Sequence, residues 1–384
     1  MDFEFTEEQR LLRESVRKMM AKVATPEYIR RLDREQAFPD ELYEEWLKMG
    51  LFRMPFPEEY GGLGGTVIDM VIIAEELSYK SFDLFTAYGG PVFCGLNILR
   101  KGTEEQKRHW IPKVLSGEVK FSISMSEPDA GSDIGAMRTT AKRDGKDWVI
   151  NGQKLWATGA GAKNNVINVY VKTDPNVFYR KGMSLFLVDN TAPGVELRKL
   201  NMLGRRCTGT YEIFFTDVRV PDERLVGGEN DGWHVVLSGL QMERITSTSG
   251  YIGGMQAILD LALDYAKERK QFGRPIGTNQ VMAHLIADMQ TELQASRLMM
   301  WHAAWMLANG KDALKEISMA KLFASEAYAR MANNGMQILG AYGYNMEFDM
   351  QRHFRDARSA TIGAGTSQMQ RNLIAGLMGL KVQS

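Results

Sequence analysis

Apolar residues recur at helical spacing through the first third of the chain. Leu12 and Val16 fall on one helical face, and Thr6 followed by Gln9 has the pattern of a capping box. A Pro- and Gly-rich stretch, 57–65, interrupts this pattern and is predicted to be a loop. We expect helices over Glu7–Ala21, Pro39–Met49 and Val67–Tyr79, and from Thr103 to Gly117.

The middle of the chain changes to short apolar runs separated by Gly, Pro, Asp and Asn. This spacing is typical of strands and favours an antiparallel barrel or sandwich. Within residues 146–156 a strand pattern contains Asn151-Gly152, a strong hairpin signal, so we expect a turn there. Further strands are predicted over Val166–Lys172, Ser184–Val188, Tyr211–Phe215 and Val218–Val220.

The last third returns to long helical patterns. Gly310 and Gly340 stand where helices should end, because glycine is the usual residue just past a helix. Several long apolar-striped helices pack most simply as a four-helix bundle. The predicted helices are Trp233–Lys270, Asn279–Ala308 and Asp312–Leu339.

The order of these elements predicts an α+β, multi-domain fold. It has an N-terminal α-helical domain, a middle antiparallel β-barrel or sandwich and a C-terminal four-helix bundle. The expected domains are residues 1–118, 119–226 and 227–384. No alternation of strand, helix and strand occurs, which disfavours a Rossmann domain.

Composition narrows the function classes. Equal numbers of basic and acidic residues, 47 each, argue against a nucleic-acid-binding protein, which would carry a basic excess. The only two cysteines, Cys94 and Cys207, cannot build a disulfide framework, so we expect a reducing, cytoplasmic location. The first ten residues have no apolar run of a secretory signal, and no stretch of about 18 apolar residues suggests a membrane span.

The sequence lacks the motifs of several kinds of catalytic chemistry. The chain has neither a GxSxG nucleophile elbow nor a GxxxxGK[ST] phosphate loop. None of its five histidines has metal-ligand spacing, so we expect no metal site.

Four segments do form a specific combination. They are residues 126–133 (SEPDAGSD), 156–158 (WAT), 268–275 (ERKQFGRP), and the C-terminal set 337–340 (QILG), 355–358 (RDAR) and 365–368 (GTSQ). Together with the α–β–α order, they make the chain resemble the acyl-CoA dehydrogenase family of flavoenzymes. The resemblance extends over nearly the whole chain.

The resemblance implies an FAD bound between the middle domain and the C-terminal bundle. Trp156 would then cover the isoalloxazine ring, and Thr158 would hydrogen-bond near N5. Arg269 would neutralise the FAD pyrophosphate from a neighbouring subunit, since a guanidinium forms paired, charge-assisted bonds with that anion. The expected cofactor residues are Met125, Ser126, Gly131, Ser132, Trp156, Thr158, Arg269, Phe272, Gln337, Gly340, Thr366 and Gln368.

The family reaction converts a fatty acyl-CoA into a trans-2-enoyl-CoA. A carboxylate takes the α-proton, and the β-hydrogen passes as hydride to flavin N5. The usual catalytic Glu stands just before Gly-Thr, where this chain has Ala364. Members resembling the isovaleryl- and long-chain enzymes place the base in an earlier Glu-Arg pair, here Glu243-Arg244. Glu243 is therefore the expected base, and the expected substrate residues are Ser132, Arg244 and Ala364.

The resemblance also implies partners. The chain has no NAD fingerprint, so electron-transfer flavoprotein is the expected electron acceptor, and the expected assembly is a homotetramer. Two alternatives remain open. One is a desulfinase-type relative that needs no α-proton abstraction, although the stretch Ser81–Phe85 lacks the Arg that such relatives use. The other is a non-catalytic subunit that binds acyl-CoA or flavin. The acyl group itself, medium, branched, terpenoid or cyclic, is not specified.

Overall fold

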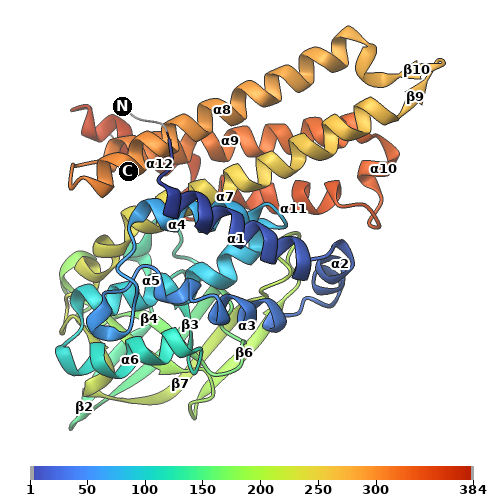
Figure 1. Ribbon diagram of the computed structural model, residues 1–384. Coiled ribbons are helices and arrows are strands. Elements are labelled where there is room, and N and C mark those ends of the chain that lie inside the picture. The colour runs from blue at the N-terminus through green and yellow to red at the C-terminus, as the bar shows by residue number, and fades with distance from the viewer. Residues whose placement is uncertain (1–3, 382–384) are drawn as a thin grey trace.

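The capping residues of the N-terminal third begin helices in the computed structural model, which describes residues 4–381 (Figure 1). Residues 1–3 of the predicted N-terminal domain and residues 382–384 of the predicted C-terminal bundle therefore lie outside the described residues. Thr6 with Gln9, and Thr103 with Gln106, form complete capping boxes, as the sequence predicts. The helices are α1 (Glu7–Val23), α2 (Pro26–Glu35), α3 (Asp40–Lys48), α4 (Val67–Ser78), α5 (Phe82–Lys101) and α6 (Glu104–Ser116).

The middle region forms an eight-stranded sheet in the order β6-β7-β3-β2-β4-β5-β8, with β1 also pairing with β4. β1 runs parallel to β4, as does the single β2–β4 pair, so the sheet is mixed and the expectation of a purely antiparallel one is corrected. The strands are β1 (Lys120–Ser124), β2 (Thr140–Asp144), β3 (Asp147–Thr158), β4 (Asn165–Lys172), β5 (Met183–Asp189), β6 (Val195–Leu200), β7 (Thr210–Pro221) and β8 (Leu225–Val226).

The predicted hairpin at Asn151-Gly152 is wrong, because β3 runs straight through it. The pairing of β3 with β7 shifts register here, and the Asn151 side chain donates to Asp217 Oδ1 of β7 at 2.9 Å. Gly152 has a φ of 143° and lies so close to Thr139 that a Cβ would be 2.6 Å from its Oγ1. The turn lies earlier, at Gly145 with a φ of 64°.

The C-terminal third is a helical bundle whose long helices end near the predicted glycines. Gly310 follows α8 with a φ of 65°, and Gly340 caps α9. A short two-stranded ribbon projects from one end of the bundle (Figure 1). The elements are α7 (Gly232–Glu268), β9 (Lys270–Gln271), β10 (Arg274–Pro275), α8 (Gln280–Ala308), α9 (Leu314–Leu339), α10 (Ala341–Tyr344), α11 (Met350–Ala360) and α12 (Ser367–Leu377).

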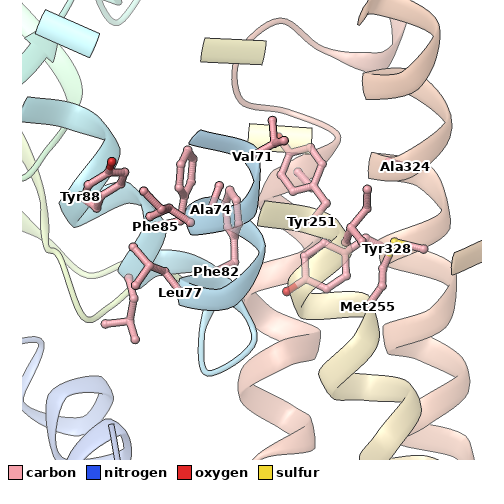
Figure 2. Packing of buried hydrophobic residues seen from close by; sticks show 14 of the residues in the cluster. Val71, Ala74, Leu77, Phe82, Phe85, Tyr88, Tyr251, Met255, Ala324 and Tyr328 are labelled. Carbon is pink, nitrogen blue, oxygen red and sulfur yellow. The ribbon is translucent and has the colours of Figure 1, made fainter. Parts of the chain in front are cut away.

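The N-terminal helices and the bundle share one apolar core. Figure 2 shows Phe82 and Phe85 of α5 on the side of this core that faces Tyr251 of α7 and Tyr328 of α9. The rings of Phe82 and Tyr251 lie 5.0 Å apart, and those of Tyr251 and Tyr328 are stacked at 6.1 Å. This packing fixes α7 against α5 along the segment that carries Glu243.

Candidate active site

A buried ion pair joins the end of β1 to β3. Lys154 is fully buried, and its Nζ donates to Glu127 Oε1 at 2.8 Å and to the Met125 carbonyl at 2.9 Å. Glu127 also accepts a hydrogen bond from the Thr139 backbone N–H at 3.0 Å. Burial lowers the pKa of Lys154, and the Glu127 carboxylate opposes that lowering. The pair therefore fixes Met125 and Ser126 beside β3.

The end of β3 presents an indole to solvent. Trp156 has a φ of 65°, an uncommon value for a bulky residue, and is 53% exposed. The neighbouring Leu155 N–H donates to the Ser126 carbonyl at 2.9 Å, which brings the two predicted cofactor segments together. Thr158 Oγ1 lies 3.4 Å from Thr210 Oγ1. Gly131 and Ser132, on the loop after β1, are both exposed.

Glu243 lies on α7 and is partly exposed. Its carboxylate makes no hydrogen bond or ion pair within residues 4–381. Burial raises the pKa of Glu243, and the charges of Arg244 and Arg205 limit the rise. Its charge in turn helps to raise the pKa of buried Cys94, so the carboxylate lies near α5. A partly exposed carboxylate with a raised pKa and no partner among the described residues can act as a base.

The loop before α12 has a strained backbone held by buried donors. Ala364 has a φ of 53° and Gly365 a φ of 86°. Lys321 of α9 is fully buried, and its Nζ donates to the carbonyls of Ala360 at 3.0 Å and Gly365 at 2.7 Å. Gln370 Nε2 donates to the Gly365 carbonyl at 3.2 Å. The Ala364 N–H has no acceptor within the described part of the chain and is free to bind a ligand.

Arg244 lies beside this loop. A Cβ on Gly365 would be 3.6 Å from Arg244 Nη2, and Arg244 Nε is buried without a hydrogen-bond partner. Burial lowers the pKa of Arg244, while Glu243 raises it. Thr366, a predicted cofactor residue on this loop, accepts a hydrogen bond from the Met369 N–H and caps α12. The GTSQ segment, residues 365–368, therefore also begins a helix.

Four predicted cofactor residues lie at the other end of the bundle. At 1.5 Å per residue, Arg269 is about 39 Å along the helical direction from Glu243, far beyond the reach of one side chain. Phe272, on the projecting ribbon, is 100% exposed with a φ of 51°. Gln337 and Gly340 are exposed at the end of α9. Within one chain, these residues do not meet Trp156 or Glu243.

Sequence reasoning missed three residues that shape the site: Lys154, Lys321 and Arg205. Lys321 interrupts an apolar stretch, and Lys154 follows the run Asn151-Gly-Gln153; both are weak signals because most lysines lie on the surface. Arg205, on the connection between β6 and β7, has no local pattern at all. Their partners are distant in sequence, so only the fold brings them together.

Comparison with known proteins decides the family. Three family models cover nearly the whole chain in order: the acyl-CoA dehydrogenase N-terminal domain over residues 6–118, the middle domain over 122–218 and the C-terminal domain over 230–378. This chain belongs to the acyl-CoA dehydrogenase family. Members of this family are FAD-dependent oxidoreductases that act on acyl-CoA.

Individual acyl-CoA dehydrogenase relatives match over almost their full length. Probable acyl-CoA dehydrogenase YngJ of Bacillus subtilis is 38% identical, over 98% of this chain and 99% of that protein. Subunit CarC of the caffeyl-CoA reductase–Etf complex of Acetobacterium woodii is 36% identical, over 97% and 99%. A solved structure of glutaryl-coenzyme A dehydrogenase with glutaryl-CoA has a TM-score of 0.94 at 34% identity, over 99% and 98%.

The side chains present fit the flavin of an acyl-CoA dehydrogenase. An exposed indole, short hydroxyls and an unpaired backbone N–H suit a flat group with a polar edge. Buried polar atoms without partners, Ser124 Oγ and Gln370 Oε1, lie on the segments that border Met125 and Gly365. Among residues 4–381 no cluster of His, Cys, Asp and Glu could hold a metal ion. Over the same range, no helix meets the length and hydrophobicity needed to cross a membrane.

Proposed function

We propose that this protein oxidises an acyl-CoA between Cα and Cβ to the trans-2-enoyl-CoA, with Glu243 as the catalytic base. The observation that supports this most is the state of Glu243. Its carboxylate is partly exposed, its pKa is raised by burial, and it has no hydrogen-bond partner in the described chain although it lies close to Arg244. Ala364, at the usual base position, cannot accept a proton, so the reaction needs a carboxylate from elsewhere.

Each residue near the loop has a distinct task in this proposal. Glu243 takes the α-proton, and its raised pKa makes it a stronger base than an exposed carboxylate. The free Ala364 N–H donates to the thioester oxygen, where negative charge develops as the proton leaves. Lys321 and Gln370 hold the carbonyls of this loop, so the N–H is oriented before substrate arrives. A bound FAD would supply the acceptor for the hydride that leaves Cβ.

The proposal assigns the cofactor to two chains. Trp156 would cover one face of the flavin ring, and Thr158 would reach its polar edge, with Met125, Ser126, Gly131, Ser132, Thr366 and Gln368 around it. Arg269, Phe272, Gln337 and Gly340 would hold the FAD of a neighbouring chain. Two facts support the second part: the distance of about 39 Å from Glu243 along the helical direction, and the complete exposure of Phe272. We infer a homotetramer built from such pairs.

The electron acceptor in this proposal is electron-transfer flavoprotein. The CarC relative is named as part of a complex with Etf, and a solved structure described for an electron-transferring flavoprotein of Acidaminococcus fermentans matches with a TM-score of 0.94. The half-exposed Trp156, which would cover the flavin ring, would face this partner. Turnover should therefore be faster with the flavoprotein than with oxygen alone, and equal rates would indicate an oxidase.

The test is anaerobic mixing of the FAD-loaded protein with acyl-CoAs. Relatives named as short-chain, isovaleryl-CoA and 2-methylacyl-CoA dehydrogenases suggest starting with short and branched acyl groups. We expect bleaching of the flavin absorbance and formation of the enoyl-CoA. A flavin that no acyl-CoA bleaches would point to a non-catalytic binding subunit, and release of sulfite from a sulfinylated propionyl-CoA would point to the desulfinase alternative.

A further inference from the structure

The ammonium of Lys154 lies behind the loop that follows β1. Lys154 is fully buried in β3, a position where a lysine is rarely found without a partner. Its Nζ donates to the Met125 carbonyl at 2.9 Å and to Glu127 Oε1 at 2.8 Å. The Glu127 carboxylate is itself held by the backbone N–H groups of Arg138 at 2.5 Å and Thr139 at 3.0 Å. The ammonium is therefore fixed against one peptide group of the loop.

That peptide group joins Met125 to Ser126. The peptide bonds of the described chain are trans, and in a trans peptide the C=O and the N–H point in opposite directions. Since the Met125 carbonyl points at the buried ammonium, the Ser126 N–H points away from it. The Ser126 carbonyl accepts from the Leu155 N–H at 2.9 Å, which keeps the loop on β3. Ser126 is partly exposed, and its N–H has no acceptor among residues 4–381.

The ammonium makes the Ser126 N–H a stronger donor. A charge-assisted hydrogen bond at the carbonyl end of a peptide polarises the whole group, so that its N–H end becomes more positive. This effect is strongest in a low-dielectric interior, and the Lys154 side chain lies in one. An acceptor that carries negative charge gains most from a donor of this kind. The loop therefore favours a ligand whose polar edge is, or becomes, anionic.

A second buried lysine makes the same kind of contact at the other loop of predicted cofactor residues. Lys321 is fully buried, and its Nζ donates to the Gly365 carbonyl at 2.7 Å. The same peptide group carries the N–H of Thr366, which is partly exposed and finds no acceptor in the described part of the chain. Two buried lysines thus each polarise a peptide whose N–H belongs to a predicted cofactor residue.

We propose that Lys154 is a positioning residue that makes the site bind the reduced, anionic flavin more tightly than the oxidised flavin. The inference rests on the proposed function, because that function places Met125 and Ser126 at the flavin. In that reaction the α-proton passes to Glu243, and the hydride, two electrons with one proton, leaves Cβ for the flavin. The flavin ring thereby gains one negative charge, which its pyrimidine nitrogen and carbonyl oxygens share. The Ser126 N–H, polarised by Lys154, stabilises that charge.

A purely structural role for Lys154 has a different consequence. If Lys154 only joined the loop to β3, its loss would weaken the binding of oxidised and reduced FAD alike, and the midpoint potential of the bound flavin would not move. Stabilisation of the anion instead favours the reduced form, so its loss makes the potential more negative. The negative charge of Glu127 opposes this stabilisation. It must be removed together with Lys154 to separate the polarised peptide from a change in net charge.

The experiment measures the two-electron midpoint potential of bound FAD by equilibration with reference dyes. Lys154→Met/Glu127→Gln removes the ion pair without changing the net charge. The affinity for reduced relative to oxidised FAD should then fall about 3- to 10-fold, which corresponds to a potential about 15–30 mV more negative than in the parent. The control is Lys142→Met, at an exposed position on the neighbouring strand β2, and it should keep the parental potential.

A second variant and the parent itself keep the inference testable. If the methionine variant does not fold, Lys154→Gln/Glu127→Gln keeps an amide at both positions and should shift the potential in the same direction. In the parent, bound FAD should have a more positive potential than free FAD. A parental potential in either folded double variant, a shift to more positive values, or a parent whose bound FAD is more negative than free FAD would overturn the inference.

The dyes reduce the flavin without any acyl-CoA, so the two proposals fail separately. A flavin that no acyl-CoA bleaches would refute the proposed function, while the potentials would still be measured. Normal bleaching together with unshifted potentials would refute only the role of Lys154.

Discussion

Lys321→Met should separate catalysis from stability. The substitution removes an ammonium that donates to the carbonyls of Ala360 and Gly365. Two hydrogen bonds from a charged donor contribute about 3–6 kcal/mol together. Burial lowers the pKa of Lys321 to about 8 from an ordinary 10.5, which costs about 3 kcal/mol at neutral pH. The stabilisation from the two hydrogen bonds and the cost of burying the charge nearly offset each other. We therefore expect a loss of at most about 3 kcal/mol in the free energy of unfolding.

The catalytic loss should be much larger. Without Lys321, the carbonyls of Ala364 and Gly365 keep only the bonds from Gln370, and the Ala364 N–H can move away from the thioester oxygen. Misplacing or losing one such donor costs about 100-fold in rate. The assays are anaerobic stopped-flow flavin reduction and urea unfolding of the FAD-loaded protein. Lys315→Met, at an exposed site on the same helix, is the control. It should change neither the rate of flavin reduction nor the free energy of unfolding.

The stability of the Lys321 variant should also differ in its pH dependence. The pKa of Lys321 is lower in the folded protein than in the unfolded chain, so the unfolded state binds more protons between pH 8 and 10.5. The parent should therefore gain stability from this group as pH rises through that window, and Lys321→Met should lack the gain. A variant that reduces flavin at the parental rate, or loses rate only in proportion to bound FAD, would refute the positioning role.

Two further substitutions test how the cofactor segments are held. Lys154→Met leaves Glu127 buried without its cation and should lower the free energy of unfolding in urea by about 3–5 kcal/mol. Adding Glu127→Gln should recover most of that loss. No recovery would mean that breaking the ion pair is not the cause. Arg269→Ala should release FAD and weaken the proposed tetramer in sedimentation experiments, whereas Arg274→Ala, on the ribbon that follows Arg269, should do neither. A monomer that keeps full FAD content would contradict shared cofactor sites.

Local sequence chemistry predicted the helix starts but not every element. The capping boxes at Thr6 and Thr103 are short-range signals and appear as predicted. Helix α5 contains Gly89, Gly90 and Pro91, residues that disfavour helices in isolation. It forms because nearly its whole length is buried between the other helices and the sheet. Tertiary packing here outweighs local propensity.

Contacts between residues far apart in sequence also explain the wrongly predicted hairpin and the site residues that the sequence did not reveal. Asn151-Gly152 has the chemistry of a tight turn, but its long-range pairing with Asp217 of β7 makes it a bulge within a strand. The motif segments led to Trp156 and Glu243 through a family resemblance, not through spacing. The partners of Lys321 lie 39 and 44 residues away, and those of Arg205 lie more than 100 residues away, so neither could be found from local pattern.

The most direct test of the central claim is flavin reduction by Glu243→Gln. This change keeps the side-chain volume but removes the proton acceptor, so FAD content should stay at the parental level. Anaerobic reduction by the best acyl-CoA should slow by about 10²- to 10⁴-fold, the usual effect of losing a general base. Asp264→Asn, at an exposed position on the same helix, is the control and should react like the parent.

Restoring a carboxylate at the usual family position completes this measurement. Ala364→Glu, added to Glu243→Gln, should recover part of the rate, with a shift toward straight-chain acyl-CoAs because the new side chain fills space near the substrate. If Glu243→Gln alone bleaches its flavin at the parental rate with every acyl-CoA that reduces the parent, Glu243 is not the base and the account is wrong.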